Sequence, residues 1–393
     1  MVGRVRKGLG SGVYGSILDL VGGTPLLRLG RVERFFRLEG VELYGKLEMF
    51  NPGGSVKDRI GLYMLMDARS RGLVEEGAVI IEPTAGNTGV GLALAAIHYG
   101  FRLVAVMPSK MSVEKELILR AYGAYVIRTP TAVPPESPLS YYRVAEAVRN
   151  LLWMIGGRPG GGEVRKVVEK VQTLVREERV EDLRSILEAS VEPTPYAYIP
   201  NQYSNPANPR AHEETTGREI WMQTGGRVDV VYAGMGTRGT ITGVARYLKR
   251  AKPSVRIVGV DPEGSIYSLV KKGMSPHEAA KHARPYKVEG IGEDFIPSTI
   301  DLSLVDEVVV VTDQQAFSMA RMLARLEGVL AGGSSGAALY AAVKHIKTRR
   351  VRGVAVVILP DTGRNYINKL YNDRWMGENG FSTRDEEVLG ELL

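Results

Sequence analysis

Short runs of β-branched and other apolar residues alternate with helical periodicity along the chain from about residue 40 onward. Such runs are typical of buried parallel strands, and the segments between them repeat apolar positions every three to four residues, as amphipathic helices do. The fold class is therefore predicted to be α/β. The predicted strands are Glu42–Leu47, Ala78–Glu82, Arg102–Met107, Tyr125–Arg128, Asp229–Ala233, Val255–Val258, Glu307–Thr312 and Val354–Leu359.

Glycines mark the ends of two predicted helices. Ser55–Arg71 carries apolar residues at helical spacing and stops at Gly72, and Asn87–Tyr99 stops at Gly100. Glycine is common just past a helix C-terminus because it adopts left-handed backbone angles without a Cβ clash.

One segment interrupts the alternation. A helix ending near Trp153 is followed by the breaker-rich linker 156–162, and residues 155–195 are predicted to form a helical insertion. Its apolar residues at helical spacing are Val164, Val167, Val168, Val171, Leu174 and Val175, then Leu183, Ile186 and Leu187. The insertion is either a surface hairpin with one docked apolar stripe, or a lid or subunit contact. The acidic residues Ser382–Leu393 are expected to form a loosely held tail.

Length and composition bound the class of protein. With 393 residues, roughly one domain per 150 residues allows two to three domains. Hydrophobic residues make up 44% and charged residues 24%, which excludes disordered, collagen-like and membrane-embedded classes. The absence of cysteine excludes a disulfide framework, a zinc ribbon, an iron–sulfur cluster and a cysteine nucleophile. No metal site is predicted.

The net charge of +7 raises the question of a nucleic-acid partner. The densest basic cluster follows an Ala-rich helical pattern, where cations complement the C-terminal end of the helix dipole, so a solvated surface is favoured. No secretory signal is evident, and no apolar stretch approaches the roughly 20 residues that a bilayer span needs. We therefore expect a cytoplasmic protein with no nucleic-acid or membrane partner. The basic cluster consists of Lys344, Lys347, Arg349, Arg350 and Arg352.

Three loops rich in glycine and hydroxyl groups sit at strand-to-helix junctions, where open α/β sheets bind ligands. They are Glu82–Gly89, Gly234–Thr240 and Gly332–Gly336. Amides and hydroxyls at a helix N-terminus attract anions, so the first loop suits a carboxylate and the second a phosphate. The second loop is not a P-loop, because it lacks the Lys-Ser/Thr ending. Each loop alone is also compatible with an ordinary capped turn.

The stretch Asn51–Arg59 (NPGGSVKDR) delivers Lys57 into the first turn of a helix. The positive end of the helix dipole disfavours the charged amine, which suits a nucleophile or Schiff-base partner. An exposed helical lysine is the alternative. The presence of all four loops favours the functional interpretation.

These four loops resemble the lysine, substrate, phosphate and pyridine-nitrogen motifs of the fold-type II pyridoxal-phosphate enzymes of the cysteine synthase and cystathionine β-synthase family. The resemblance runs from about Ser16 to Phe381, except for the insertion. The stretches similar specifically to cystathionine β-synthases, above all bacterial ones, are Thr131–Tyr142, Gln202–Trp221, Gly259–Ser265, Val288–Pro297 and Leu359–Met376.

The resemblance implies two open, twisted, mainly parallel sheets flanked by helices, as in the tryptophan synthase β subunit, with the active site between the domains. Residues 40–150 would form a smaller mobile domain with the Schiff-base lysine and the substrate loop. Residues 14–39 and 196–372 would form the larger cofactor-phosphate domain, and residues 373–393 a C-terminal tail. A homodimer is expected from the family.

The resemblance also implies a role for each site residue. Lys57 would form the internal aldimine with pyridoxal 5′-phosphate and act as the catalytic base. Asn87 would bind the 3′-oxygen of the cofactor, and Ser334 would face its pyridine nitrogen. The implied phosphate-binding residues are Gly236, Thr237, Arg238, Gly239 and Thr240. The implied substrate-binding residues are Thr84, Ala85, Gly86, Thr88 and Gln202, with Gly290, Ile291 and Gly292 as the wall over the reacting atoms.

The implied reaction is β-replacement, joining L-serine to L-homocysteine through an aminoacrylate to give cystathionine. The alternative is cysteine synthase, which would use sulfide with O-acetylserine, O-phosphoserine or serine. A cofactor-binding protein without turnover is disfavoured because Lys57, Asn87 and Ser334 are all present. A dinucleotide oxidoreductase is disfavoured because the first βα unit lacks a well-placed G-x-G-x-x-G fingerprint.

Three positions depart from the family pattern. Arg238 stands where glycine is usual, so it strains the loop, contacts phosphate or points to solvent. Ala85 stands where serine is common, which removes a hydroxyl near the substrate carboxylate. Glu293 follows the wall residues and would either pair with the amino group of a larger thiol or cap a turn.

Overall fold

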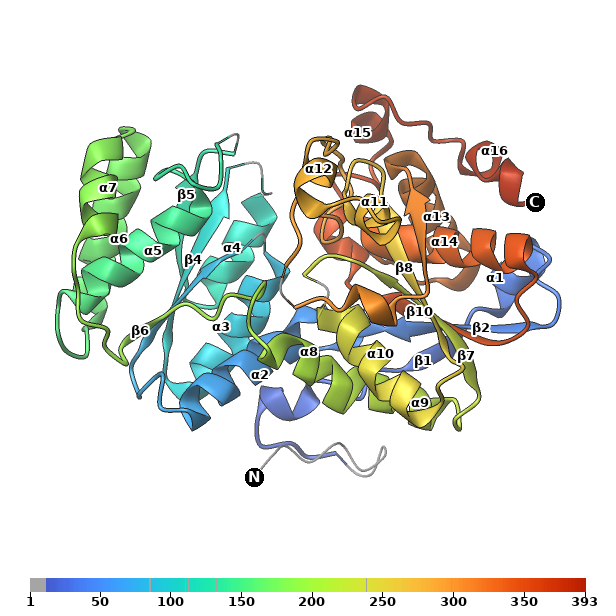
Figure 1. The fold of residues 1–393 in the computed structure, drawn as a ribbon, viewed down its shortest axis with the longest axis horizontal. Coiled ribbons are helices and arrows are strands. Elements are labelled where there is room, and N and C mark those ends of the chain that lie inside the picture. The colour runs from blue at the N-terminus through green and yellow to red at the C-terminus, as the bar shows by residue number, and fades with distance from the viewer. Residues whose placement is uncertain are drawn as a thin grey trace. The chain divides into compact units, whose positions relative to one another are not determined.

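The computed structural model describes residues 12–84, 86–109, 111, 113–131, 133–237, 239–297 and 299–393. The chain divides into two compact units, each with its own sheet (Figure 1). Unit 1 contains Gly22–Val56 and Asn208–Leu393, and unit 2 contains Tyr14–Val21 and Lys57–Ala207.

Unit 1 is built on a six-stranded sheet in which only the edge strand β1 runs antiparallel to its neighbour. Its strands, in spatial order, are β1 (Leu26–Arg28), β2 (Val41–Leu47), β10 (Gly353–Leu359), β7 (Val228–Gly234), β8 (Arg256–Pro262) and β9 (Glu307–Val311). Helices cover both faces, which explains why the central strands read as continuous apolar runs.

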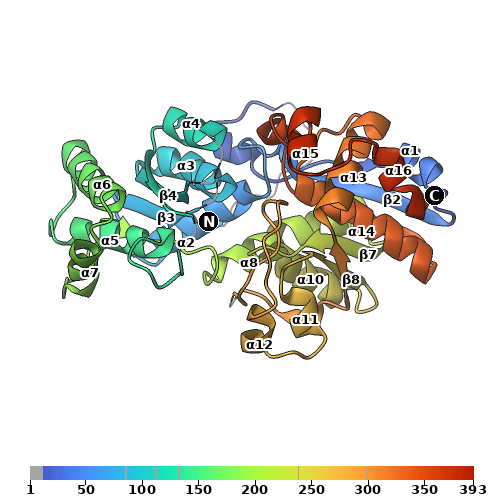
Figure 2. The ribbon, with the colours of Figure 1, turned by 90° about the horizontal axis from the view of Figure 1, so that it is seen from above.

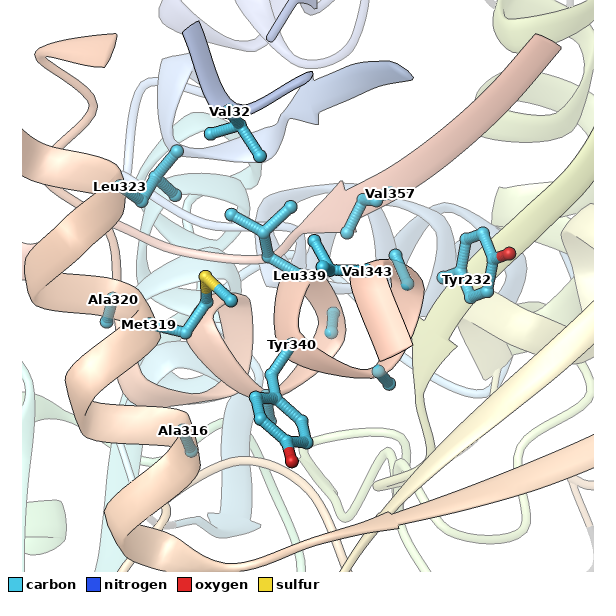
Figure 3. Packing of buried hydrophobic residues seen from close by; sticks show 14 of the residues in the cluster. Val32, Tyr232, Ala316, Met319, Ala320, Leu323, Leu339, Tyr340, Val343 and Val357 are labelled. Carbon is cyan, nitrogen blue, oxygen red and sulfur yellow. The ribbon is translucent and has the colours of Figure 1, made fainter. Parts of the chain in front are cut away.

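The two faces of strand β10 show this arrangement. Val357 points into a core formed with α13 (Asp313–Glu327) and α14 (Gly333–Arg349), where Leu339 and Val343 pack against it (Figure 3). Val356, one residue earlier, belongs to the core on the opposite face, under α10 (Gly239–Ala251). Successive side chains therefore enter different cores, as the pleat of a doubly covered strand requires.

Shorter elements complete unit 1. The α-helices are α1 (Gly30–Phe35), α8 (Ala207–Ala211), α9 (Arg218–Gln223), α11 (Tyr267–Lys271), α12 (Pro276–Ala280), α15 (Asp373–Glu378) and α16 (Asp385–Val388), with a π-helical turn at His212–Gly217. The 3₁₀ turns are Glu48–Phe50, Leu302–Leu304, Gly363–Tyr366 and Gly390–Leu392.

Unit 2 is built on a four-stranded parallel sheet. Its strands, in spatial order, are β5 (Tyr125–Thr129), β4 (Arg102–Pro108), β3 (Val79–Pro83) and β6 (Ala197–Tyr198). Its helices are α2 (Lys57–Ser70), α3 (Asn87–Tyr99), α4 (Val113–Ala121), α5 (Tyr141–Trp153), α6 (Gly161–Arg176) and α7 (Val180–Glu188), with a 3₁₀ turn at Ile17–Leu20. Together with the parallel sheet of unit 1, this confirms the predicted α/β class.

The insertion forms the predicted pair of helices, α6 and α7, which lie beside α5 in both views (Figures 1 and 2). Val164, Val168 and Val171 are buried in one core with the sheet of unit 2. Gln172 accepts a hydrogen bond from the backbone amide of Arg128 at 2.8 Å and donates one to its carbonyl at 3.2 Å. α6 therefore satisfies part of the open edge of β5, as expected for a docked hairpin.

The boundaries of the units differ from the predicted domains. Residues 40–56 belong to unit 1 because β2 pairs with β10 along its whole length, in the register Val41 to Gly353. Residues 196–207 belong to unit 2, where β6 pairs with β3. Residues 14–21 also belong to unit 2, in which the hydroxyl of Ser16 lies 3.1 Å from His98 Nδ1.

The prediction of a loosely held C-terminal tail is wrong. Asp385 of α16 has a fully buried side chain and pairs with Arg321 and Arg325 of α13. Leu389 and Leu392 are buried in the core of unit 1. The acidic composition of residues 382–393 predicted a solvated tail. In the structure, however, Asp385 pairs with two arginines, and the leucines of this segment cover α13 and α14. Among the residues that the structure describes, no helix has the length and apolarity needed to cross a membrane.

Arg321 offers a matched test of this docking. It pairs with Asp385, whose side chain is 0% exposed, and with Asp373, whose side chain is 72% exposed. Asp385→Asn removes the buried carboxylate that pairs with Arg321 and Arg325 and leaves Arg321 only its exposed partner, so we expect a loss of about 3 kcal/mol in unfolding free energy. Asp373→Asn removes an exposed pair and should cost less than about 1 kcal/mol. Urea unfolding of both variants measures the difference, and equal losses would contradict the docking.

Candidate active site

Lys57 is the first residue of α2, as the sequence predicted. The loop before it is held within unit 1 by Asn51, which is 3% exposed. The Asn51 amide donates to the Glu48 carboxylate at 3.0 Å, and its side-chain oxygen accepts from the Gly22 amide at 2.8 Å. The amide of Val56 donates to the carbonyl of Pro360 at 2.8 Å. The breaker-rich sequence therefore forms a fixed turn that ends at the lysine.

The backbone of Lys57 also lies against α3. A Cβ atom added to Gly91 of α3 would come within 2.4 Å of the Lys57 carbonyl oxygen, and one added to Gly61 of α2 within 2.3 Å of the Gly91 carbonyl carbon. Real Cβ contacts are never this short, so only glycine permits the two helices to approach so closely here. The lysine-bearing helix is thus fixed against the helix that begins at Asn87.

The predicted carboxylate loop has the form of an anion site at the start of α3. Thr84 Oγ1 accepts hydrogen bonds from the amides of Gly86 at 3.2 Å and Gly89 at 3.3 Å. Gly86 has φ of +134°, which favours glycine. Thr88 Oγ1 donates to Gln202 Oε1 at 2.6 Å, although the two residues are 114 positions apart. The structure therefore brings Thr84, Gly86, Thr88 and Gln202 together.

Glu82 is a buried acid next to this loop that received no role from the sequence. It is 0% exposed and lies near the end of β3. Its carboxylate accepts the backbone amides of Asn201 at 3.0 Å and Gln202 at 3.2 Å. Burial raises the pKa of Glu82 to about 8, although these two hydrogen bonds act in the opposite direction. A lone acid within the apolar run Val79–Pro83 is the signal that could have identified it.

Lys115 of α4 is a second residue that sequence reasoning missed. It is 6% exposed, and a Cβ on Gly86 would come within 2.7 Å of its Cδ. Its aliphatic stem therefore packs on the carboxylate loop. No local pattern marks it, because the contact joins a helical lysine to a loop almost thirty residues earlier.

The predicted phosphate loop follows β7 and opens the 13-residue helix α10. Thr237 is 7% exposed, and its hydroxyl accepts a hydrogen bond from Asn208 Nδ2 at 3.2 Å. The Thr240 hydroxyl lies 3.2 Å from His212 Nε2. A Cβ on Gly239 would overlap the side chain of Asn208, so a larger residue there would displace the group that donates to Thr237. Two braced hydroxyls and a helix N-terminus suit a phosphate group.

The predicted wall lies directly on the phosphate loop. The amide of Gly292 donates to the carbonyl of Met235 at 2.7 Å. A Cβ on Gly236 would come within 2.4 Å of the carbonyl oxygen of Gly290, and one on Gly234 within 2.4 Å of the side-chain Cγ2 of Ile291. The backbone of Glu293, the next residue, exchanges two hydrogen bonds of 3.1 Å with the hydroxyl of Ser265.

Ser334 lies in the first turn of α14 and is 3% exposed. The amide of Gly332 donates to the carbonyl of Asp361 at 3.1 Å, which fixes the start of this loop. The neighbouring hydroxyl of Ser335 is fully buried and has no hydrogen-bond partner among the described residues. The third loop is therefore a buried, hydroxyl-bearing helix N-terminus.

The predicted residues fall into two sets. Unit 2 holds Lys57, Thr84, Gly86, Asn87, Thr88 and Gln202, and unit 1 holds Gly236, Thr237, Gly239, Thr240, Gly290, Ile291, Gly292 and Ser334. Ala85 and Arg238 lie outside the described residues. Their predicted effects on the carboxylate and phosphate loops stay predictions.

The crossing of α2 and α3 yields a stability test. Gly91→Ala places a methyl group on the Lys57 carbonyl, and we expect it to lower the unfolding free energy by about 1–3 kcal/mol through overpacking. Gly162→Ala in α6 is the matched control, because a Cβ there meets nothing within 4 Å. It should be neutral or stabilising by up to about 1 kcal/mol. Chemical denaturation measures both, and a Gly91→Ala protein as stable as Gly162→Ala would refute the tight crossing.

Comparison with known proteins places the chain in a family. The family profile described as "Pyridoxal-phosphate dependent enzyme" matches residues 17–361. Cystathionine beta-synthase of Oryctolagus cuniculus is 42% identical over 371 residues, covering 94% of this chain and 58% of the rabbit protein. This chain therefore spans less than two thirds of that curated relative.

Two solved structures cover nearly all of both chains. Cysteine synthase from Entamoeba histolytica has a TM-score of 0.73 and 32% identity, covering 99% of this chain and 98% of its own. An O-acetylserine-dependent cystathionine beta-synthase from Helicobacter pylori has a TM-score of 0.68 and 33% identity, covering 91% and 98%. With the loops described above, these matches show that the chain belongs to the family of pyridoxal-phosphate-dependent enzymes.

Proposed function

We propose that this chain catalyses β-replacement on L-serine, joining it to L-homocysteine to form cystathionine. The observation that carries the proposal is the contact between α2 and α3. It fixes the backbone of Lys57 against the helix whose first turn and preceding loop carry the hydroxyls of the proposed carboxylate site. An amine and a carboxylate site on two locked helices suit a reaction on an α-amino acid.

The described residues fit pyridoxal phosphate. Thr237 and Thr240 are braced hydroxyls beside a helix N-terminus, as a phosphate monoester requires. When bound, the cofactor supplies an electrophilic carbonyl carbon and a conjugated ring that withdraws electrons from the amino acid attached to it. In this proposal Gly236 and Gly239 complete the phosphate site, and Arg238 belongs to the same loop.

The remaining roles follow from the chemistry of the side chains. Asn87 would donate to the 3′-oxygen of the cofactor, and Lys57 would bond its carbonyl carbon and then carry the proton removed from the substrate Cα. Ser334 would face the pyridine nitrogen with a neutral hydroxyl. Because a hydroxyl does not force protonation of that nitrogen as a carboxylate does, it favours loss of the β-substituent over a long-lived carbanion.

The substrate would be bound by its carboxylate. The hydroxyl of Thr84, which accepts the amide of Gly86, would donate its hydrogen to one oxygen. Gln202, whose side-chain oxygen accepts from Thr88, would donate through its NH₂ group to the other. Ala85 belongs to the same loop. Gly290–Gly292 would cover the reacting atoms and exclude water. Because the amide of Gly292 donates to the carbonyl of Met235, the position of this wall depends on that of the phosphate loop.

Cysteine synthase is the second candidate, and the similarity to the enzyme of Entamoeba histolytica favours it. It differs in the leaving group and in the nucleophile, which would be sulfide. Hydroxide leaves only with more proton assistance than acetate or phosphate, so the donor substrate separates the two functions.

The test combines L-serine and L-homocysteine with protein loaded with pyridoxal phosphate, and measures cystathionine by mass spectrometry. We expect product from the native protein and a loss of about 10³-fold or more in Lys57→Ala, which lacks the base. Lys166→Ala, an exposed lysine of α6, is the control and should retain full rate.

Two results decide between the candidates. Cysteine from O-acetylserine and sulfide, with no product from serine and homocysteine, would replace the proposal by cysteine synthase. Full turnover in Lys57→Ala would refute the mechanism itself.

We further propose that the protein is a cytoplasmic homodimer. In unit 2, Ile17 and Ile97 are 46% and 57% exposed, on segments joined by the contact between Ser16 and His98. Such neighbouring exposed apolar side chains suit a subunit interface. Sedimentation equilibrium should give twice the chain mass, and Ile97→Glu should shift it toward the monomer. A monomer in the native protein would contradict the proposal.

A further inference from the structure

Glu82 links two segments of unit 2 that are far apart in sequence. It lies near the carboxyl end of β3, and its carboxylate spans the backbone amides of Asn201 and Gln202. These amides belong to a tight turn in which Asn201 has φ of +53° and Asn205 donates to the carbonyl of Pro200 at 2.9 Å. Two consecutive amides held by one carboxylate fix the direction of the peptide between them.

The contact continues into the carboxylate loop. Gln202, whose amide is held by Glu82, accepts a hydrogen bond from Thr88 with its side chain. Glu82 itself is followed in sequence by Pro83 and Thr84. One acid therefore ties together the strand that enters the loop and the turn that supplies Gln202.

We propose that Glu82 is a positioning residue that holds Gln202 in place to bind the substrate carboxylate. This inference rests on the proposed function, because it assumes an amino-acid carboxylate at Thr84, Thr88 and Gln202. Glu82 touches neither the substrate nor Lys57 in this assignment. It acts through the backbone of Gln202, so its loss weakens carboxylate binding and leaves the rate of the chemical step unchanged.

An acid holds the turn in a way that an amide side chain does not. An ionised carboxylate has two acceptor oxygens for two amide donors, whereas glutamine offers one oxygen and an NH₂ group that faces a second donor. Burial keeps the pKa of Glu82 near 8, so the ionised form becomes dominant only as pH rises through that value. The titratable groups near it are Tyr198 of β6, which senses Glu82, and Asp67 and Arg71, which in turn act on Tyr198.

The effect of Glu82→Gln on glycine binding should increase with pH. Below pH 8 the neutral carboxyl resembles glutamine, with one carbonyl acceptor. Above pH 8 the ionised carboxylate accepts both amides with charge-assisted bonds, so the turn is held more firmly. The ratio of the dissociation constant of Glu82→Gln to that of the native protein should therefore rise with pH. Taking this ratio cancels titrations common to both proteins, including that of the ligand amine.

The experiment measures glycine binding through the visible absorption band of protein loaded with pyridoxal phosphate, at pH 6.5 and pH 9. Glycine carries the carboxylate and amine but no β-substituent, so binding is separated from β-replacement. For Glu82→Gln we expect a dissociation constant near that of the native protein at pH 6.5 and about 10-fold higher at pH 9. With serine and homocysteine at pH 9, the KM of Glu82→Gln should rise while kcat stays the same.

The matched control is Glu327→Gln. Glu327 of α13 also accepts two consecutive amides, those of Arg31 at 2.7 Å and Val32 at 2.9 Å, but the segment it holds, the start of α1, carries no predicted site residue. Its variant should bind glycine as the native protein does at both pH values. This control shows whether a change in glycine binding comes simply from losing a carboxylate that holds two amides, or from the position of Glu82.

A second measurement does not depend on turnover or on the cofactor. Amide hydrogen exchange at residues 201 and 202, corrected for the intrinsic effect of pH, should be about 10-fold faster in Glu82→Gln than in the native protein at pH 9. Faster exchange without a change in glycine binding would overturn the inference and leave Glu82 a structural residue. Unchanged exchange would also overturn it, because the hold on the turn would then be absent.

The outcomes are separable from those of the proposed function. Native protein that binds glycine but makes no cystathionine refutes the proposed function alone, and the glycine ratio still decides the role of Glu82. Native protein that does not bind glycine refutes the carboxylate site and, with it, this inference.

Discussion

The close crossing of α2 and α3 is the constraint on which the arrangement of unit 2 depends. Gly61 and Gly91 remove the side chains that would keep the helices apart, so the carbonyl of Lys57 packs directly on the backbone of α3. Because α3 starts at the carboxylate loop, the lysine and the loop move as one body. Ordinary helix packing at 8–10 Å between axes would leave room for side-chain rearrangement between them. At the two glycines there is no such space, because the backbones of the helices are in direct contact.

Much of the fold could be predicted, because the central strands are buried on both faces and read as unbroken apolar runs. β1 and β6 were missed since three and two residues are too short to show a period. The placement of β2 was wrong for another reason. Its neighbours in sequence belong to α2, but its hydrogen bonds go to β10, some 300 residues later. Periodicity reports which face is buried and carries no information about the partner strand.

The same limit separates the predicted site residues from the missed ones. Glycine-rich and hydroxyl-rich loops can be recognised from local sequence, so the loops that carry Thr84, Thr88, Thr237 and Ser334 could be identified from the chain alone. The role of each residue came from the family resemblance. Gln202 came only from the family resemblance. Glu82 and Lys115 received no role, because their importance lies in contacts with segments distant in sequence. The docked C-terminus was misjudged similarly, since the buried partners of Asp385 lie in α13.

The two predicted anion loops share one construction, which a list of binding residues does not reveal. In each, a threonine hydroxyl bonds a side-chain amide from another segment, but the directions differ. Thr88 donates to the oxygen of Gln202, so the donor that this bond orients is the NH₂ group of Gln202, whereas Thr237 accepts from Asn208. Asn208 donates to Thr237, so this contact occupies a lone pair of the hydroxyl oxygen rather than its hydrogen. A brace of this kind orients a neutral donor before any anion arrives. Since a preoriented donor loses little freedom on binding, the braces contribute to affinity without adding charge. A substitution of the bracing residue should then weaken anion binding as much as a substitution of the threonine, because replacing either one leaves the other free to rotate away from the anion.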